Sequence, residues 1–282
     1  MLDVERWTLD VSARLDLRLT QMPNRIDECF KSLRSQSEKA FIAYISAGDP
    51  NLPATVDLAL ALEKAGVDLL ELGVPFSDPL ADGVVNQAAA QRALEAGATV
   101  PGVLECVRQI RRRSQIPIVL YTYLNPIFQF GLERFHTEAD EAGVDGLLLL
   151  DLPPEEDQPG KGPFHIRLIA PTTPAERIQK ICATAAGFIY YVSREGVTGA
   201  QSGVASSLGA QVSEIRQHTK LPIVVGFGIS TPEQAREVAQ TADGVVVGSA
   251  IVQRIGDDAA KPDLAERIGE FVRPLVAAVK GH

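Results

Sequence analysis

The sequence predicts an α/β fold in which eight parallel strands close into a (β/α)8 TIM barrel. From residue 40 onward, short apolar runs rich in Val, Ile and Leu alternate with longer segments of helical period, as in successive βαβ units. Most of these runs are apolar on both faces, which a sheet covered by helices requires. Eight such runs in one chain of 282 residues with 45% hydrophobic content favour a single closed barrel over an open sheet or two domains.

The predicted elements follow one another along the chain in strand–helix order. The predicted strands are 41–46, 69–73, 118–122, 146–150, 164–169, 188–192, 223–226 and 244–248. The predicted helices include 51–65, 103–112, 132–142 and 231–241, the last of which begins with Ser230-Thr231-Pro232 as cap and first turn. The basic run Arg111-Arg112-Arg113 is expected to be the solvated end of a helix.

The connection between the fourth and fifth predicted strands departs from this order. Residues 157–163 contain two prolines and two glycines, so a full helix has no room there. We therefore expect a loop in place of a barrel helix, with the neighbouring strands less covered than usual. The shortened connection threatens stability more than chemistry.

The barrel is expected to comprise residues 22–282, because a helical pattern of Ile26, Phe30 and Leu33 begins just after Met22, which is an alternative start. Residues 1–21 are expected to be an N-terminal extension. Apolar and polar residues alternate between Leu9 and Leu19, which indicates an amphipathic strand or a poorly ordered segment.

Charge and cysteine content exclude several classes of protein. A net charge of −9 and a pI near 5.0 argue against binding to nucleic acid or an anionic membrane, since both require a concentrated basic face. No apolar stretch reaches the roughly 18 residues of a membrane span, and no signal-peptide core is present, so we expect a cytoplasmic protein. Cys29, Cys106 and Cys182 are odd in number and lack metal-ligand spacing, which indicates packing roles in a reducing compartment.

The segment 71–83, ELGVPFSDPLADG, places a carboxylate inside an apolar strand. Because side chains alternate along a strand, Glu71 shares a face with Leu69 and Gly73, whereas the leucines at 70 and 72 face the helix layer. Glu71 is therefore expected to point into the barrel mouth, where burial raises its pKa toward the range in which a group both gives and takes a proton. The alternative is an edge-strand glutamate that faces water.

Asp82 ends a loop stiffened by two prolines and is the candidate for a second carboxylate at the same mouth. An Asp-Gly pair before a helical segment is equally well explained as a turn or an N-cap. Asp78, which precedes Pro79, is expected to organise the loop.

The last two strands end in glycines, which favours a phosphate site. Gly228 begins the turn to Pro232 after the seventh strand, and Gly248-Ser249 follows the eighth. Backbone N–H groups at such turns, with the N-terminus of the next helix, attract an anion. One glycine turn alone is better explained by turn geometry, but two in succession favour an anion site.

Aromatic residues end the sixth predicted strand. Tyr190 and Tyr191 lie on opposite faces, so one is expected to contact a substrate while the other packs outward, although core packing explains either one alone. The four histidines share no spacing, so neither a metal site nor a histidine base is expected.

The segments described above, together with those given below, show that the chain resembles the tryptophan synthase alpha chain family from about residue 24 onward. The segment 71–83 is highly specific to that family. Further matching segments are 47–50 (AGDP), 123–126 (YLNP), 151–153 (DLP), 193–199 (SREGVTG), 226–230 (GFGIS) and 248–252 (GSAIV).

The resemblance implies a lyase of tryptophan biosynthesis that cleaves indole-3-glycerol phosphate to indole and glyceraldehyde 3-phosphate by a retro-aldol reaction, with neither cofactor nor metal. It assigns the proton transfers at the glycerol hydroxyl and at indole C3 to Glu71, and stabilisation of positive charge at the indole nitrogen to Asp82. Tyr190 matches a tyrosine near the glutamate and the substrate. The positions that match substrate-binding residues are Tyr44, Tyr121, Thr198, Gly199, Phe227, Gly228, Gly248 and Ser249.

Within that set, Thr198 and Gly199 match a mobile loop that closes over the substrate, with Thr198 positioning Asp82. The phosphate-binding positions are Gly199, Gly228, Gly248 and Ser249. The implied partner is a pyridoxal-phosphate beta subunit, in an alpha2beta2 heterotetramer, which receives the indole through a tunnel. Asp78, Asn125 and Pro153 match positions at that interface.

Three features depart from the family pattern. Tyr44 stands where Phe is common, which adds a hydroxyl that needs a partner. The segment 84–87, VVNQ, replaces Pro-Val-Ile-Gln, so Asn86 puts an amide where an apolar side chain is usual. The third is the short connection at 157–163.

Three alternative functions stay open on the sequence. A phosphate-binding isomerase of the tryptophan or histidine pathways would share the late glycine turns but would need another acid–base pair than the segment 71–83 provides. A non-catalytic binding subunit would keep the fold and activate a partner. A stand-alone lyase would release indole without a partner.

Overall fold

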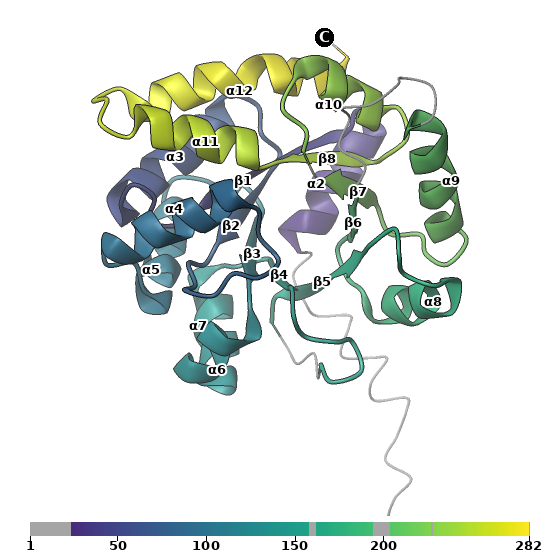
Figure 1. The fold of residues 1–282 in the computed structure, drawn as a ribbon, viewed down its shortest axis with the longest axis horizontal. Coiled ribbons are helices and arrows are strands. Elements are labelled where there is room, and N and C mark those ends of the chain that lie inside the picture. The colour runs from purple at the N-terminus through teal and green to yellow at the C-terminus, as the bar shows by residue number, and fades with distance from the viewer. Residues whose placement is uncertain (1–23, 158–161, 194–203, 227, 282) are drawn as a thin grey trace, which may run out of the picture.

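The computed structural model describes residues 24–157, 162–193, 204–226 and 228–281, and in them the predicted barrel is confirmed (Figure 1). The strands pair in parallel in chain order, and β8 pairs with β1, which closes the sheet. The strands are β1 Ala40–Ser46, β2 Leu69–Gly73, β3 Ile118–Thr122, β4 Gly146–Leu149, β5 Phe164–Ile169, β6 Ile189–Val192, β7 Ile223–Gly226 and β8 Gly244–Val247.

The predicted strand boundaries hold to within one residue. Those of β2, β3, β5 and β7 are as predicted, and each of the other four strands differs by one residue at one end. The strand boundaries are predicted accurately because each strand is a short apolar run, and the residues on either side of the run do not take part in the parallel hydrogen-bond ladder.

Helices surround the barrel, as Figure 1 shows. In chain order they are α2 Arg25–Ser35, α3 Leu52–Lys64, α4 Val84–Glu95, α5 Val100–Arg111, α6 Leu124–Phe130, α7 Leu132–Ala142, α8 Ala175–Thr184, α9 Val204–Arg216, α10 Pro232–Ala239, α11 Ser249–Asp258 and α12 Leu264–Lys280. Among the described helices, none is both long and apolar enough to cross a membrane.

Capping residues set the helix starts. The Asn51 side chain accepts a hydrogen bond from the N–H of Ala54 and opens α3. The predicted helix 103–112 begins three residues early, at Val100, because Thr99 caps it and a proline lies in its first turn. The predicted helix 231–241 uses Thr231 as its N-cap and ends at Ala239.

Side chains of alternate strand residues divide into two buried layers. Leu70 and Leu72 of β2 belong to the outer layer, between the sheet and the helices. Leu69 belongs to the inner layer, inside the barrel. The predicted alternation of β2 is confirmed, and it is this alternation that directs residue 71 inward.

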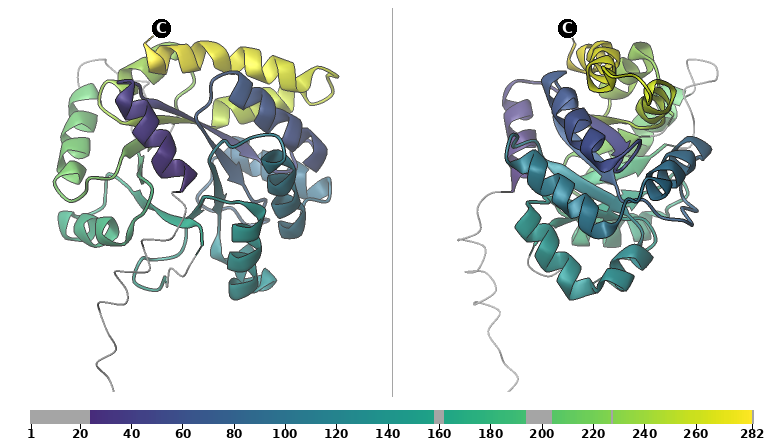
Figure 2. Two further views of the ribbon diagram at one scale, coloured as in Figure 1. Left: turned by 180° about the vertical axis from the view of Figure 1, so that it is seen from behind. Right: turned by 90° about the vertical axis from the view of Figure 1, so that its left-hand side faces the viewer.

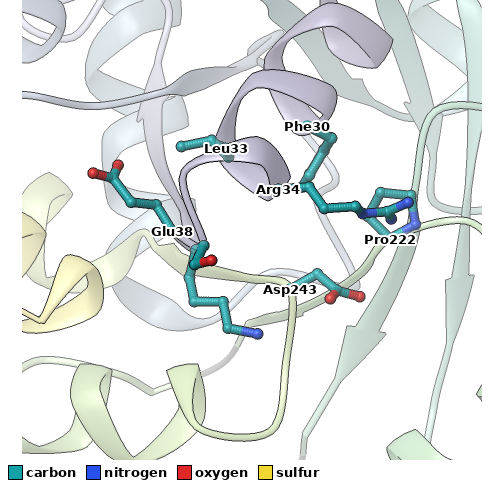
Figure 3. Close-up of a pocket in the computed structure, with 8 residues that line it drawn as sticks. Phe30, Leu33, Arg34, Glu38, Pro222 and Asp243 are labelled. Atoms are coloured by element: carbon teal, nitrogen blue, oxygen red, sulfur yellow. The ribbon is translucent and has the colours of Figure 1, made fainter.

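Helix α2 closes the end of the barrel where the strands begin, and Figure 2 (left) shows it lying across that end. Its Ile26, Phe30 and Leu33 are buried with the inner layer. A pocket beside α2 is lined in part by Phe30, Arg34 and Asp243 (Figure 3). Asp243 immediately precedes β8, so this pocket lies at the end opposite to the carboxyl ends of the strands, where barrel enzymes place their chemistry.

The connection between β4 and β5 has no helix in its described residues, as predicted, but the expectation of poorly covered strands is wrong. His165 and Arg167, on the outer side of β5, are 5% and 4% exposed. An Asp157 carboxylate oxygen lies 2.5 Å from Nδ1 of His165 and accepts a hydrogen bond from Arg167 at 2.5 Å. A buried ionic cluster therefore covers the strand where an apolar helix face would otherwise pack.

The expectation of a solvated basic run is also wrong for its first residue. The Arg111 side chain is 10% exposed and forms a 2.6 Å ion pair with Asp145. It also donates to the carbonyl of Gly143 at 2.8 Å. Arg111, at the end of α5, thereby pairs with backbone and carboxylate groups just before β4, because its long side chain reaches Gly143 at the C-cap of the neighbouring α7.

Candidate active site at the barrel mouth

Inward-facing residues near the carboxyl ends of β1, β2, β3 and β6 form one polar and aromatic cluster. Tyr44 of β1 is in register with Glu71 of β2, and Tyr121 of β3 is in register with Gly73. Tyr190 of β6 belongs to the same inner layer, whereas Tyr191 belongs to the outer one. The predicted opposite orientation of the two tyrosines is confirmed, and Tyr190 is the one that faces the barrel interior.

Glu71 is fully buried in this cluster, with 0% of its surface exposed. Within the described chain, neither of its carboxylate oxygens has a hydrogen-bond partner. Burial without a compensating cation raises the pKa of Glu71 to about 8. The edge-strand alternative is excluded, and the side chain can exchange a proton near neutral pH.

Two glycines leave room for the tyrosine rings beside Glu71. A Cβ at Gly73 would lie 2.5 Å from the Tyr44 hydroxyl oxygen, and one at Gly226 would lie closer still to that of Tyr190. Both distances are far below van der Waals contact, so only glycine fits at these positions while the rings keep their places.

Asp82 reaches the same mouth from the loop between β2 and α4. Its two carboxylate oxygens accept hydrogen bonds from the hydroxyls of Tyr121 at 3.0 Å and Tyr123 at 2.8 Å. Gly83, not Asp82, is the N-cap of α4, so the capping explanation of this aspartate does not hold. Burial raises the pKa of Asp82, and hydrogen bonds from Tyr123, Tyr121 and Asn86 oppose that rise.

The charges of Glu71 and Asp82 affect the pKa of the same two tyrosines, Tyr44 and Tyr190. Burial is the main cause that raises the pKa of Tyr44 and of Tyr190, and the charges of Glu71 and Asp82 raise both further. The carboxylates of the two acids therefore converge on one site although they belong to a strand and a loop, respectively.

Aromatic rings wall this site. Tyr44 and Tyr121 meet edge to face, with centroids 5.0 Å apart and planes at 71°. Phe76 lies 5.5 Å from Tyr123, whose hydroxyl also accepts a hydrogen bond from the N–H of Ala81 at 3.0 Å. The loop that carries Asp82 is therefore attached to the end of β3.

Sequence reasoning missed the role of Tyr123 in holding Asp82. Tyr121 and Tyr123 are two residues apart at a strand end, so they present their side chains to the same side. That spacing was the signal in the sequence, but nothing in it reveals which carboxylate the pair would meet. Sequence reasoning also missed the ion pair that fixes α4, in which the Arg92 guanidinium donates to both oxygens of the buried Asp49, at 2.9 and 2.7 Å.

The glycine turns after β7 and β8 lie where the phosphate site was expected, but their helix ends differ. The N–H groups of Ser230 and Thr231 are bonded to the Gln234 side chain, as part of a capping box on α10. The N-cap of α11 is Gly248, and none of the described side chains caps this helix. The N–H groups at the start of α11 are thus the better anion donors, with Gly228, at φ 68°, in the adjacent turn.

Three of the expected substrate-binding residues, Thr198, Gly199 and Phe227, lie outside the described residues. The same is true of the expected extension 1–21. Of the other expected site residues, the structure places Tyr44, Glu71, Asp82, Tyr121 and Tyr190 together at the mouth.

Comparison with known proteins gives a consistent match. The family model described as tryptophan synthase alpha chain matches residues 30–280. The tryptophan synthase alpha chain of Opitutus terrae is 52% identical over 264 residues, which cover 91% of this chain and 99% of that protein. The tryptophan synthase alpha chain of a Geobacter strain, M21, is 51% identical over 262 residues, covering 91% and 98%.

A solved structure agrees with the sequence matches. The crystal structure of tryptophan synthase subunit alpha from Legionella pneumophila strain Paris superposes with a TM-score of 0.83 at 41% identity. The match covers 92% of this chain and 99% of that one. The similarity therefore extends over the whole described barrel.

Proposed function

The chain belongs to the tryptophan synthase alpha chain family, and from that premise we propose how its residues carry out the family's reaction. As an alpha subunit it is a lyase of tryptophan biosynthesis, which cleaves indole-3-glycerol phosphate to indole and glyceraldehyde 3-phosphate and acts with a beta subunit. The observation that carries the proposal is the buried Glu71 carboxyl at the barrel mouth, which no described residue pairs with.

Glu71 is the acid and the base of the cleavage. With a pKa of about 8, it holds a proton at neutral pH and gives that proton to C3 of the indole ring. The resulting carboxylate then takes the proton of the hydroxyl on the carbon bonded to C3. That O–H pair becomes the aldehyde carbonyl, the carbon–carbon bond breaks, and its electrons restore the indole ring. Glu71 ends the cycle protonated, as it began.

Asp82 stabilises the positive charge that protonation of C3 creates on the ring nitrogen. Its hydrogen bonds with the hydroxyls of Tyr121 and Tyr123 fix the carboxylate and favour its charged form. A carboxylate held in advance loses little freedom when the charge develops, which is the basis of electrostatic catalysis.

Substrate binding is divided between the wall and the glycine turns. Tyr44 and Tyr121 offer a T-shaped aromatic wall for the indole ring, and Tyr190 contacts substrate near Glu71. Gly228, Gly248 and Ser249 bind the phosphate, with the uncapped N-terminus of α11 as the main donor. Thr198, Gly199 and Phe227 complete this assignment, on the strength of the family resemblance alone.

The partner surface lies beside the mouth. Leu80 and Val84, on either side of Asp82, are 93% and 80% exposed, and Phe128 of α6 is 62% exposed. Large exposed apolar side chains of this kind are typical of a protein interface. Asp78 and Asn125, which are also exposed, adjoin them in sequence. We place the beta subunit of an alpha2beta2 heterotetramer on this surface.

We place the enzyme in the cytoplasm. Its three cysteines carry free thiols in the structure, and Cys106 and Cys182 are buried in the helix layer. A reducing compartment keeps such thiols unpaired.

Indole release measured from indole-3-glycerol phosphate, with and without a beta subunit, tests the proposal. The expected result is cleavage that the beta subunit accelerates and that Glu71→Gln abolishes. No indole under either condition would instead identify a binding subunit, and equal rates under both would identify a stand-alone lyase.

A further inference from the structure

The Tyr44 side chain lies between the two parts of the site that bind phosphate and transfer protons. Its strand, β1, pairs with β8, which precedes Gly248, and with β2, which carries Glu71. We propose that Tyr44 is a specificity-determining residue, whose hydroxyl donates a hydrogen bond to the middle hydroxyl of the glycerol chain of the substrate. This inference rests on the proposed function and names the part of indole-3-glycerol phosphate that the Tyr44 hydroxyl recognises.

Two glycines show where the two ends of the Tyr44 side chain lie. A Cβ added to Gly248, the N-cap of α11, would lie 3.3 Å from the Cβ of Tyr44. A Cβ added to Gly73, the last residue of β2, would lie 2.5 Å from the hydroxyl oxygen of Tyr44. Glu71 precedes Gly73 by two residues and faces the same side of the strand. The Tyr44 ring therefore extends from the helix end assigned to phosphate to the strand end beside Glu71.

The Tyr44 hydroxyl forms no hydrogen bond with the described part of the chain. In the same part of the chain, the side-chain polar atoms that are both unpaired and completely sealed from solvent belong to Glu71, Asn86 and Arg167. Because the unpaired Tyr44 oxygen is not one of these atoms, solvent reaches it. The hydroxyl therefore faces the open mouth of the barrel and is accessible to a ligand there.

The Tyr44 hydroxyl is a protonated donor on a fixed ring. Burial, followed by the charges of Asp82 and Glu71, raises the pKa of Tyr44, so the hydroxyl keeps its proton at neutral pH. The edge-to-face contact with Tyr121, whose centroid is 5.0 Å away, holds the ring in place. Tyr121 donates its own hydroxyl to Asp82. A donor that is fixed before a ligand binds loses little freedom on binding.

The substrate has one hydroxyl to which the proposed reaction assigns no partner. With the phosphate at the N-terminus of α11 and indole C3 beside Glu71, the glycerol chain passes along Tyr44. The hydroxyl on the carbon bonded to C3 gives its proton to Glu71. The middle hydroxyl lies one carbon nearer to the phosphate, and leaving it unpaired in the site would be unfavourable. The Tyr44 hydroxyl is the donor that this oxygen lacks.

The test compares two substrates in the complex with a beta subunit. One is indole-3-glycerol phosphate, and the other is its analogue in which hydrogen replaces the middle hydroxyl. The analogue keeps the hydroxyl that Glu71 deprotonates, so its retro-aldol cleavage gives indole and 3-oxopropyl phosphate. In Tyr44→Phe, we expect kcat/KM for the natural substrate to fall about tenfold, and kcat/KM for the analogue to stay within about twofold of wild type. If the analogue is cleaved too slowly to follow, its inhibition constant replaces kcat/KM.

The matched control is Tyr191→Phe, which removes a hydroxyl from the outer layer, where Tyr191 donates to Gln211. We expect its kinetics with both compounds to equal those of wild type. In Tyr44→Phe, an equal fall for both compounds, as a purely structural role would give, or an unchanged kcat/KM for the natural substrate would overturn the proposal. So would loss of the discrimination in Tyr190→Phe in place of Tyr44→Phe. Failure of the proposed function is distinct, because the wild type would then release indole from neither compound.

Discussion

Replacing Glu71 by glutamine tests the acid–base assignment and the burial of the carboxyl in one variant. Glutamine has nearly the volume of the protonated acid, so the barrel packing is kept, but it transfers no proton. Loss of general acid–base catalysis typically costs about 10² to 10⁴ in rate, and here the same side chain serves both transfers. We expect the turnover of the variant to be at or below the detection limit, although the variant still folds.

The same substitution should stabilise the protein at neutral and alkaline pH. Burial raises the pKa of Glu71 from 4.5 to about 8, so the folded state holds a proton that the unfolded chain releases more easily. The stability that this proton contributes is complete below pH 4.5 and is lost as the pH rises to about 8. At about 1.4 kcal/mol per pH unit, the wild type has lost about 3 kcal/mol at pH 7 and about 5 kcal/mol above pH 8. Glutamine is uncharged throughout and loses none of it.

Urea unfolding of the wild type and the variant at pH 5, 7 and 8.5 measures this difference. The free energy of unfolding of Glu71→Gln, relative to wild type, should increase steadily over that series. The exposed Glu141, replaced by glutamine in the same way, provides the control and should leave both activity and the pH dependence of stability unchanged. A difference between Glu71→Gln and wild type that does not vary with pH would refute the reasoning, because the carboxyl would then titrate alike in folded and unfolded chains.

Three other substitutions test separate parts of the structure. Asp82→Asn should lower kcat less than Glu71→Gln does, since it removes a charge and not a proton donor; equal losses in steady-state assays would point to proton transfer by Asp82. Gly226→Ala should lower kcat/KM roughly 10²-fold by displacing the Tyr190 ring, and wild-type kinetics would contradict the tight fit. Asp157→Ala should destabilise the barrel by about 3 kcal/mol, because it leaves Arg167 buried without its partner. Burial favours the neutral acid, but His165 and Arg167 outweigh burial and lower the pKa of Asp157. The stabilisation by Asp157 should therefore be present at neutral pH and fade as the pH falls through the pKa of the folded state. A variant as stable as wild type at pH 7 would count against the cluster.

Much of the fold follows from the sequence because its signals are local. Apolar runs of strand length mark β1 to β8, and the strict alternation around residue 71 is enough to turn Glu71 inward. Tyr190 is assigned to the interior by the same rule. The glycines after β7 and β8 indicate a site lined by backbone groups. Glycine is favoured where a turn requires positive φ, as at Gly228, or where the N-cap of a helix has no side chain, as at Gly248.

Other features depend on side chains that meet across long sequence separations. In the sequence, the segment before β5 shows only that a helix is missing. Its prolines and glycines do not reveal that Asp157 covers β5 by pairing with His165 and Arg167. Arg111 is predicted to be solvent-exposed at a helix end for the same reason, since its partner, Asp145, is 34 residues away in the chain.

The sequence by itself determined the number and order of the strands, the face on which Glu71 lies and the end of the barrel that carries chemistry, since these depend on residue periodicity and strand direction. Tertiary structure alone decided that Glu71 has a raised pKa and no partner among the described residues, that Tyr121 and Tyr123 hold Asp82, and that of α10 and α11 only α10 has a side-chain cap in the described part of the chain. These properties arise from desolvation and hydrogen-bond pairing, which exist only once the strands have closed and brought distant residues into contact.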